Sequence, residues 1–481
     1  MAMEFTRRQF FGGLSALLAT ASAKSYAAAT GAGKPNLTFG VLSDVHISPS
    51  ACMARFLGGD RAAHRVRETD LLETAFRYFD EQGADGVLIA GDIADWGLVG
   101  QLQAVADCWY KVFPNGRSTR DGRKVEQLFV LGNHDFEGFK YGGPKKACGK
   151  TKIPKEEILA TDMSANWKRL FHEPYRPIWQ KEVKGYTFIG AHWGTWKGIE
   201  GIEAYMKAHG PALAGKRPFF YAQHPQPKDT CLGAWIWGHD DGRSTRALSP
   251  YPNAVAFSGH SHKALTNELN VWQGAFTSIG TATLGFVGTG VGRENGPRTV
   301  ANHRSAMAYL RGCRDGVTEV AHGQLVRVYD GFIEVERRDF VRGEPVGPNW
   351  VVPVPAGKEA PFLYANRAAA SQAPGPFPEG AKIEVTKADG KVRLAFPPAR
   401  AIAGASPIAD YEIEAVHEEA DVVRTLFTRY VYGPGVYFDA TKEKGPIVAE
   451  FDEKLFPKGG RFFFRARAHE IFGKFNAPIE S

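Results

Sequence analysis

Long apolar runs and paired cysteines are both scarce in this sequence. No segment offers the roughly 20 consecutive apolar residues that a membrane-spanning helix needs, so we expect no transmembrane segment in the mature chain. The cysteines are odd in number and are not arranged as CxxC pairs. We interpret them as structural thiols or as one disulfide, and predict no chemistry for them. They are Cys52, Cys108, Cys148, Cys231 and Cys313.

Low-complexity sequence and an excess of one charge are also missing. The 59 basic and 52 acidic residues are mixed along the chain, which leaves a net charge of +7. This diffuse pattern indicates solubility and mild attraction to anions, and we infer no specific nucleic-acid binding. At 481 residues the chain is too long for one ordinary core, so we expect two domains. The 54 glycines and 29 prolines favour loops and β structure over a helical bundle.

The N-terminus carries an arginine pair, then a weakly apolar stretch, then a small-x-small site. Thr6-Arg7-Arg8-Gln9-Phe10 is the arginine segment, and Ala21-Ser22-Ala23 is the candidate cleavage site. Residues 1–29 therefore resemble a twin-arginine export signal, although a first helix of the fold is the alternative. Such a signal is read by the twin-arginine export machinery, which moves proteins that are already folded and have often loaded a cofactor. We expect a periplasmic or secreted protein.

Strand-like and helix-like segments alternate in the first part of the chain. The apolar runs 37–43, 86–90 and 127–131 predict strands, and the segments 65–82 and 101–113 predict helices. This rhythm indicates βαβ units with right-handed crossovers, whose ligand sites lie just past the carboxyl ends of the strands. Three later apolar runs, GYTFIGAHW, PFFYAQHP and AVAFSGHSH, each end at histidine. The run GQLVRVYDGFIEVERRDF predicts a hairpin that turns at Asp330-Gly331.

Five polar motifs follow apolar runs of this kind. They are Asp44-Val45-His46, Gly91-Asp92, Gly132-Asn133-His134-Asp135, His224 and Gly259-His260-Ser261-His262. This set resembles the calcineurin-like metallophosphoesterase family, whose signature is DxH, GD, GNH[DE], H and GHxH. The resemblance covers residues 36–344. It implies an α/β fold in the form of a four-layer αββα sandwich, with two mixed sheets inside and helices outside.

The resemblance also implies a centre of two divalent or trivalent metal ions, of iron, manganese or zinc. One ion would be held by Asp44, His46 and His262, the other by Asn133, His224 and His260, and Asp92 would bridge them. Carboxylate and neutral imidazole ligands suit such metals. Two carboxylates against two ions of about +4 or +5 in total leave a surplus of about +2 to +3, which a bridging hydroxide and a phosphoryl oxygen would use.

The same motif suggests two residues that act beside the metals. By resemblance, His134 protonates the leaving alkoxide or stabilises charge on the phosphoryl group. Asp135 would hold the ring of His134 through a hydrogen bond; the alternative is that Asp135 caps a helix or turn. His192, which also ends a strand, is either a substrate contact or a packed core histidine.

Other features near these motifs carry weaker expectations. Asp95 stands where purple acid phosphatases have a ligating tyrosine, which disfavours that subfamily. Six lysines between 140 and 155 form either a basic lid or a solvated loop. The glycine-rich run TLGFVGTGVGREN precedes no clear helix, so we do not interpret it as a nucleotide loop.

The last part of the chain has a different pattern. Residues 345–379 are rich in proline and predict a linker, and residues 380–481 contain alternating runs that predict half-buried strands. The closing run FFFRARAHEIFGKFNAP resembles a fibronectin type III module, an immunoglobulin-like β-sandwich. Phe462 departs from this pattern, because such modules usually carry the corner tyrosine there.

These features predict an exported binuclear metal-dependent phosphoesterase that hydrolyses phosphate mono- or diesters by attack of metal-bound hydroxide. Within this class, a cyclic-nucleotide or glycerophosphodiester phosphodiesterase is the alternative. A different class is also considered: a non-catalytic surface-binding scaffold with a vestigial metal site. The expected partner of the enzyme is a small-molecule phosphate ester, and substrate loops carry no readable code that would identify it.

Overall fold

The computed structural model describes most of the chain. It covers residues 33–48, 61–136, 163–194, 199–232, 239–287, 320–357, 360–402, 408–433 and 445–481. The expected export signal, the lysine-rich insertion and most of the glycine-rich run lie outside these residues. Of the cysteines, Cys108 and Cys231 are described, and both are buried free thiols. Among the described residues, no helix is long and apolar enough to cross a membrane.

The first of two sheets in the N-terminal part has the order β12-β11-β10-β1-β2-β3, with β13 also paired to β11. Its strands are β1 (Leu37–Leu42), β2 (Gly86–Ala90), β3 (Glu126–Val130), β10 (His322–Tyr329), β11 (Phe332–Asp339), β12 (Glu344–Pro345) and β13 (Trp350–Pro353). Strands β1, β2 and β3 are parallel, whereas β10 runs antiparallel to β1, so the sheet is mixed. Strands β1 and β2 are buried at every position, as expected for parallel strands that are covered on both faces.

The second sheet has the order β4-β5-β6-β7-β9-β8. Its strands are β4 (Ile178–Val183), β5 (Tyr186–Ala191), β6 (Phe219–Ala222), β7 (Ala254–Ser258), β8 (Val271–Gln273) and β9 (Thr277–Gly280). Strands β5, β6, β7 and β9 are parallel, and the edge strands β4 and β8 are antiparallel to their neighbours. This sheet contains the three apolar runs that end at histidine.

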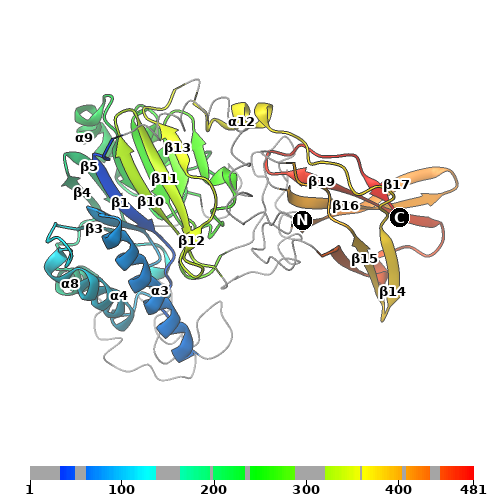
Figure 1. The fold of residues 1–481 in the computed structure, drawn as a ribbon, viewed down its shortest axis with the longest axis horizontal. Coiled ribbons are helices and arrows are strands. Elements are labelled where there is room, and N and C mark those ends of the chain that lie inside the picture. The colour runs from blue at the N-terminus through cyan, green and yellow to red at the C-terminus, as the bar shows by residue number, and fades with distance from the viewer. Residues whose placement is uncertain are drawn as a thin grey trace, which may run out of the picture.

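Helices lie against the two sheets (Figure 1), and the layers pack through separate apolar clusters. Helices α3 (Arg61–Glu81), α4 (Val99–Val112) and α8 (Met163–Phe171) cover the first sheet, and α9 (Ile202–His209) and α10 (Arg243–Leu248) cover the second. Between the two sheets lies a further cluster, in which the ring centroid of Phe39 from β1 is 5.1 Å from that of Phe188 from β5. The expectation of mixed α/β sheets is therefore confirmed for this part of the chain. Short 3-10 helices lie at η1 (Pro114–Gly116), η2 (Gly210–Leu213) and η3 (Glu268–Asn270).

The C-terminal region is all-β and separate from these sheets (Figure 1). Helix α12 (Tyr364–Ala370) precedes it. Its strands are β14 (Glu384–Ala388), β15 (Lys391–Phe396), β16 (Ile408–Glu419), β17 (Val422–Tyr432), β18 (Ile447–Asp452), β19 (Arg461–Glu470) and β20 (Ile479–Glu480), with the 3-10 helix η5 (Glu453–Leu455) before β19. One sheet has the order β14-β15-β18 and the other β17-β16-β19-β20, and side chains from both share one apolar cluster. We call residues 380–481 the C-terminal β region.

Candidate metal centre

The polar motifs lie just past the carboxyl ends of parallel strands. Asp44 and Asp92 each lie two residues beyond β1 and β2, and Asn133 lies three residues beyond β3. In the second sheet, His224 and His260 each lie two residues beyond β6 and β7. Because the carboxyl ends of parallel strands share one edge of a sheet, and the two sheets pack face to face, these side chains converge from both sheets.

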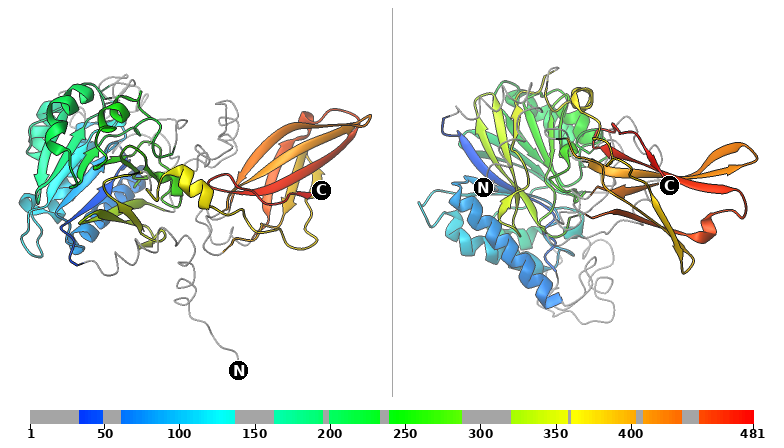
Figure 2. Two further views of the ribbon diagram at one scale, coloured as in Figure 1. Left: turned by 90° about the horizontal axis from the view of Figure 1, so that it is seen from above. Right: turned by 45° about the vertical axis from the view of Figure 1, so that its right-hand side comes forward.

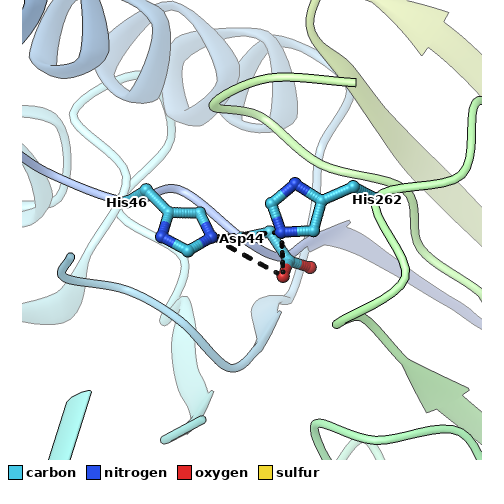
Figure 3. A group of neighbouring side chains, drawn as sticks. All are labelled: Asp44, His46 and His262. Carbon is cyan, nitrogen blue, oxygen red and sulfur yellow. Dashed lines mark hydrogen bonds and ion pairs between the residues drawn. The ribbon is translucent and has the colours of Figure 1, made fainter. Parts of the chain in front are cut away.

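One compact group consists of Asp44, His46 and His262 (Figure 3). Nε2 of His262 lies 3.0 Å from Oδ1 of Asp44 and 3.1 Å from Nε2 of His46. Nε2 of His46 lies 3.9 Å from the same carboxylate oxygen. Each residue therefore presents one ligand atom toward a common point.

A second group consists of Asp92, His224 and His260. Nε2 of His224 lies 2.9 Å from Oδ2 of Asp92 and 3.0 Å from Nδ1 of His260. The two groups adjoin, because Nε2 of His46 is 3.8 Å from Oδ2 of Asp92, and Nε2 of His224 is 3.9 Å from Oδ1 of Asp44. Each carboxylate therefore also approaches a histidine of the other group, and Oδ2 of Asp92 is the oxygen that would face both ion positions.

The hydrogen bonds of two rings fix which nitrogen faces the site. Nδ1 of His262 lies 2.9 Å from the carbonyl oxygen of Phe286, and Nδ1 of His224 lies 2.8 Å from that of Ala90. A carbonyl oxygen only accepts, so each Nδ1–H donates to it, and in the neutral ring Nε2 keeps its lone pair. Both Nε2 atoms face carboxylates of the site. Backbone carbonyls of this kind orient metal-ligating histidines in other proteins.

The charged side chains of the site are buried away from solvent. Burial alone would raise the pKa of Asp44, but His262 and His224 beside it lower that pKa below its usual range. The pKa of Asp92 is likewise lowered against the effect of burial, chiefly by His224. Burial would lower the pKa of His224, yet Asp92 and Asp44 raise it to about 9. The carboxylates are therefore ionised, as metal ligands must be, and His224 would release a proton when an ion binds.

The backbone is strained at five residues of the two groups. Each has a positive φ, between 50° and 65°, namely Asp44, His46, Asp92, His260 and His262. Such values are uncommon for residues other than glycine and cost about 1–3 kcal/mol each, so they persist where the surrounding structure enforces them. Their concentration here is what we expect of a functional site.

Two motif glycines leave room for side chains from other strands. A Cβ on Gly132 would collide with Oδ1 of Asp92, and a Cβ on Gly259 would collide with Oδ2 of Asp44. Each collision involves a short, buried carboxylate that has no space to move away. The glycines of GNHD and GHSH are therefore required by the close approach of the two aspartates.

The side chain of Asn133 tests whether the residues fit metal ions. It is 1% exposed, and its Oδ1 has no hydrogen-bond partner among the described residues. A buried acceptor without a partner costs about 1–3 kcal/mol, and a metal ion beside it would remove that cost. Two ionised carboxylates, several imidazoles and one neutral amide oxygen form a donor set that suits iron, manganese or zinc. The residues therefore fit the expected metals.

His134 forms a third possible group of metal-binding atoms with His46 and Asp92, one residue from each of the two groups. Its ring centroid is 4.6 Å from that of His46, and its backbone N–H donates to Oδ1 of Asp92 over 2.9 Å. Its Nδ1 lies 2.9 Å from the carbonyl oxygen and 3.4 Å from the Oδ1 of Asp95. Because Nδ1–H donates to the carbonyl, Nε2 of the neutral ring keeps its lone pair.

The expected support of His134 by Asp135 is wrong. The carboxylate of Asp135 accepts hydrogen bonds from three backbone N–H groups, those of Gly132, Ile93 and Ala94, over 2.8, 3.2 and 2.8 Å. Consecutive residues in a helical turn do not face each other, so Asp135 points away from the ring that it follows. It ties the GNHD loop to the loop after β2, which agrees with the alternative of a cap, and burial raises its pKa to about 7.

His192 is a packed histidine, as the alternative reading proposed. It is 3% exposed, and its Nδ1 accepts the backbone N–H of Leu131 over 2.9 Å. Its ring is stacked on Tyr175 at 4.9 Å and touches Trp167 edge-on. Burial lowers its pKa to about 3. The predicted substrate contact is therefore not supported, and His192 instead holds the end of β3.

Sequence reasoning missed the contacts that three side chains make around the site. The carboxylate of Asp95 lies 3.5 Å from Nδ1 of His46 and close to His134, so it orients two rings at once. The ring of Phe286 lies 4.3 Å from that of His262, and the ring of Trp193 lies 5.7 Å from that of His260. An acid three residues after the GD motif could have pointed to Asp95, but no sequence signal marks the two aromatic residues.

Replacing Asp95 with asparagine should lower kcat by about 10–100-fold, the usual cost of losing a group that orients metal ligands. The substitution removes the charge that fixes His46 and His134 but keeps the size of the side chain. Steady-state kinetics with a chromogenic phosphate ester would measure kcat, and metal content would be measured on the same sample.

Asp135→Asn is the matched comparison, because it also removes one buried carboxylate from the same loop. An amide nitrogen cannot accept hydrogen bonds from the backbone N–H groups that Asp135 now satisfies. The free energy of unfolding of the variant should therefore fall by about 1–3 kcal/mol. A normal kcat in Asp95→Asn, together with a large loss of kcat in a stable Asp135→Asn, would restore the original assignment.

Comparison with known proteins agrees with this geometry. Residues 37–264 match the model of the calcineurin-like phosphoesterase family. Similar solved structures include a dimetal phosphatase from Danio rerio, with 12% identity over 66% of this chain and 99% of that chain, and a TM-score of 0.34. A purple acid phosphatase from yellow lupin (Lupinus luteus) shows 14% identity over 67% of this chain and 55% of its own, with a TM-score of 0.38. These TM-scores are below 0.5, so the assignment rests on the family model.

No curated protein matches the chain. The family match nevertheless covers all five motifs, from Asp44 to His262. Residues 37–264 are a calcineurin-like phosphoesterase domain, and this chain is a metal-dependent phosphoester hydrolase.

Proposed function

We propose that this protein is an exported hydrolase of phosphate mono- or diesters with a centre of two metal ions. The observation that carries the proposal is the pair of adjoining groups, in which Asp92 of the second group also lies 3.8 Å from Nε2 of His46 in the first. A site for one ion would not need two histidine groups that share a carboxylate. The four-layer sandwich and the fibronectin type III-like module belong to the same proposal, as does export through residues 1–29.

In the proposed reaction the metal ions and the residues around them have different roles. When bound, two metal ions would polarise the phosphoryl group and lower the pKa of a metal-bound water to near neutral. Asp44 and Asp92 would balance only part of the charge of such ions, and the remaining positive charge would attract an anionic substrate. In its protonated form His134 would give the proton on Nε2 to the leaving oxygen, while the carbonyl of Asp95 accepts from Nδ1–H and orients the ring.

A panel of phosphate esters tests the proposal. Monoesters, diesters, cyclic nucleotides, glycerophosphodiesters and phospholipid head groups would each be assayed with iron, manganese and zinc. Hydrolysis of one class, dependent on added metal, is the expected result. Preference for cyclic nucleotides or glycerophosphodiesters would select the narrower phosphodiesterase alternative. Stoichiometric metal with no hydrolysis of any ester would contradict the proposal.

Export is tested separately by cell fractionation. Replacing both arginines of the N-terminal pair, Arg7 and Arg8, with lysine should retain the folded protein in the cytoplasm, because the export receptor reads that pair. Unchanged export of the double variant would show that residues 1–29 do not act as a twin-arginine signal.

A further inference from the structure

Two segments of chain lead away from the histidines of the candidate metal centre. One runs from His224 to Leu232, and the other runs from His260 to Leu269. They are joined close to the site, where the backbone N–H of Gly259 donates to the carbonyl of His224 over 3.0 Å. They meet again at their far ends, where the N–H of Leu232 donates to the carbonyl of Leu269 over 2.9 Å. We call these the two histidine segments.

Helix α12 touches the far ends of both histidine segments. The hydroxyl of Tyr364 accepts from the N–H of Leu232 over 3.0 Å and donates to the carbonyl of Leu269. One turn later, Nη2 of Arg367 lies 2.5 Å from Oε2 of Glu268, and Nη1 of the same guanidinium donates to the carbonyl of Glu268. Two side chains of one short helix therefore bind both segments.

Glu268 links helix α12 to residues that lie closer to the metal site. Its other oxygen, Oε1, accepts from Nη1 of Arg337 over 2.8 Å, and the same nitrogen donates to the carbonyl of Leu265, also over 2.8 Å. The amide of Asn270 donates to the carbonyl of Ala264 over 2.7 Å. The chain that follows His262 is thus held at successive residues up to the 3-10 helix η3.

Helix α12 lies between the N-terminal sheets and the C-terminal β region (Figure 2), and the same side chains also pack against that region. Phe472, which is 1% exposed, lies with its ring 4.9 Å from the guanidinium of Arg367. Phe472 and Ile471 share one apolar cluster with Tyr364 and with Leu232 and Leu269 of the histidine segments. Nζ of Lys474 adds a hydrogen bond of 3.2 Å to the carbonyl of Ala369. The packing is therefore continuous from the C-terminal β region to the histidine segments.

We propose that α12 positions the histidine side of the metal centre, and that the C-terminal β region serves this role by keeping α12 in place. Tyr364 and Arg367 are the positioning residues. The inference rests on the proposed function, in which His224, His260 and His262 hold metal ions. It gives the C-terminal β region a task within the enzyme, where sequence reasoning offered only an attached module.

The test uses the full chain with Tyr364→Phe, Arg367→Met and the double variant. These changes keep the apolar volume and remove the hydroxyl and the charge. The double variant should lose its metal to a chelator about 10-fold faster than the parent protein, and Arg367→Lys should recover part of the difference because it keeps the charge. Arg461→Met is the control, since Arg461 pairs with Glu418 on an exposed surface.

Hydrogen exchange supplies a readout that needs no metal. In metal-free protein, the double variant should exchange faster in residues 225–232 and 259–270, while strands β1 and β2 exchange as before. Unchanged exchange in both segments, or metal release at the parental rate, would overturn the inference. The metal content of the parent protein decides the proposed function separately, so a failure of one is distinguishable from a failure of the other.

Discussion

Asp92→Asn should lower kcat/KM for phosphate ester hydrolysis by about 10³-fold or more, which corresponds to about 4 kcal/mol of lost transition-state stabilisation. Asp92 is the carboxylate that lies within 3.8 Å of His46 and 2.9 Å of His224, so it contacts both groups of the candidate centre. Its other oxygen accepts the backbone N–H of His134. One substitution therefore disturbs both groups of the candidate centre and the GNHD loop. Kinetics and metal content would be measured on the same preparation.

Asp80→Asn is the control for this experiment. Asp80 is also a buried acid in the same domain, 5% exposed, but it pairs with Arg123, away from the metal centre. The control should keep its metal and its activity. If Asp92→Asn retains full metal content and full activity, Asp92 does not bridge two ions, and the site must be assigned differently.

His134→Ala should lower kcat by about 10²–10⁴-fold while the metal content stays unchanged, the range expected when a general acid is removed. The ring lies beside both groups and is held through Nδ1, so its loss removes a proton donor without removing one of the seven predicted ligands. Activity should be compared between an ester with an acidic phenol as the leaving group and one with an alkyl alcohol.

The leaving group decides between the two roles considered for His134. A phenolate leaves without a proton, so a general acid should matter far more for the alkyl ester than for the phenyl ester. Equal losses for both esters would instead support stabilisation of charge on the phosphoryl group. Loss of metal in the variant would contradict both roles, because His134 would then be a ligand.

Much of the fold follows from local patterns in the sequence. The spacing of Leu71, Leu72, Ala75, Phe76 and Phe79 predicts one buried face of a helix. In α3, Leu71 is 9% exposed and the other four are 0% exposed. The predicted hairpin at Asp330-Gly331 forms between β10 and β11, where Tyr329 pairs with Phe332. These features depend on residues near one another in the chain, so periodicity and turn chemistry are sufficient to predict them.

The residues that form the candidate site were predictable for a different reason. Each motif alone is weak, but strand ends in parallel sheets converge, and the five motifs supply complementary donors. The structure groups six of the seven predicted ligand residues in two adjoining clusters, and Asn133 follows in the loop just past β3. Their roles as ligands stay a prediction until metal is measured.

The predictions that were wrong concern contacts between side chains, which local sequence patterns do not determine. The support of His134 depends on which way two consecutive side chains point, and the loop geometry gives that contact to Asp95 instead of Asp135. The packing of His192 depends on Tyr175, a residue from a different segment. The contacts of Tyr364 and Arg367 join residues about 95 to 130 positions apart. Such pairings arise from tertiary packing.

Metal analysis of protein purified from its native compartment tests the central claim most directly. The account predicts about two ions of iron, manganese or zinc per chain, loss of ester hydrolysis when a chelator removes them, and recovery when they are restored. One ion per chain, no ion, or hydrolysis that persists in the metal-free protein would contradict it.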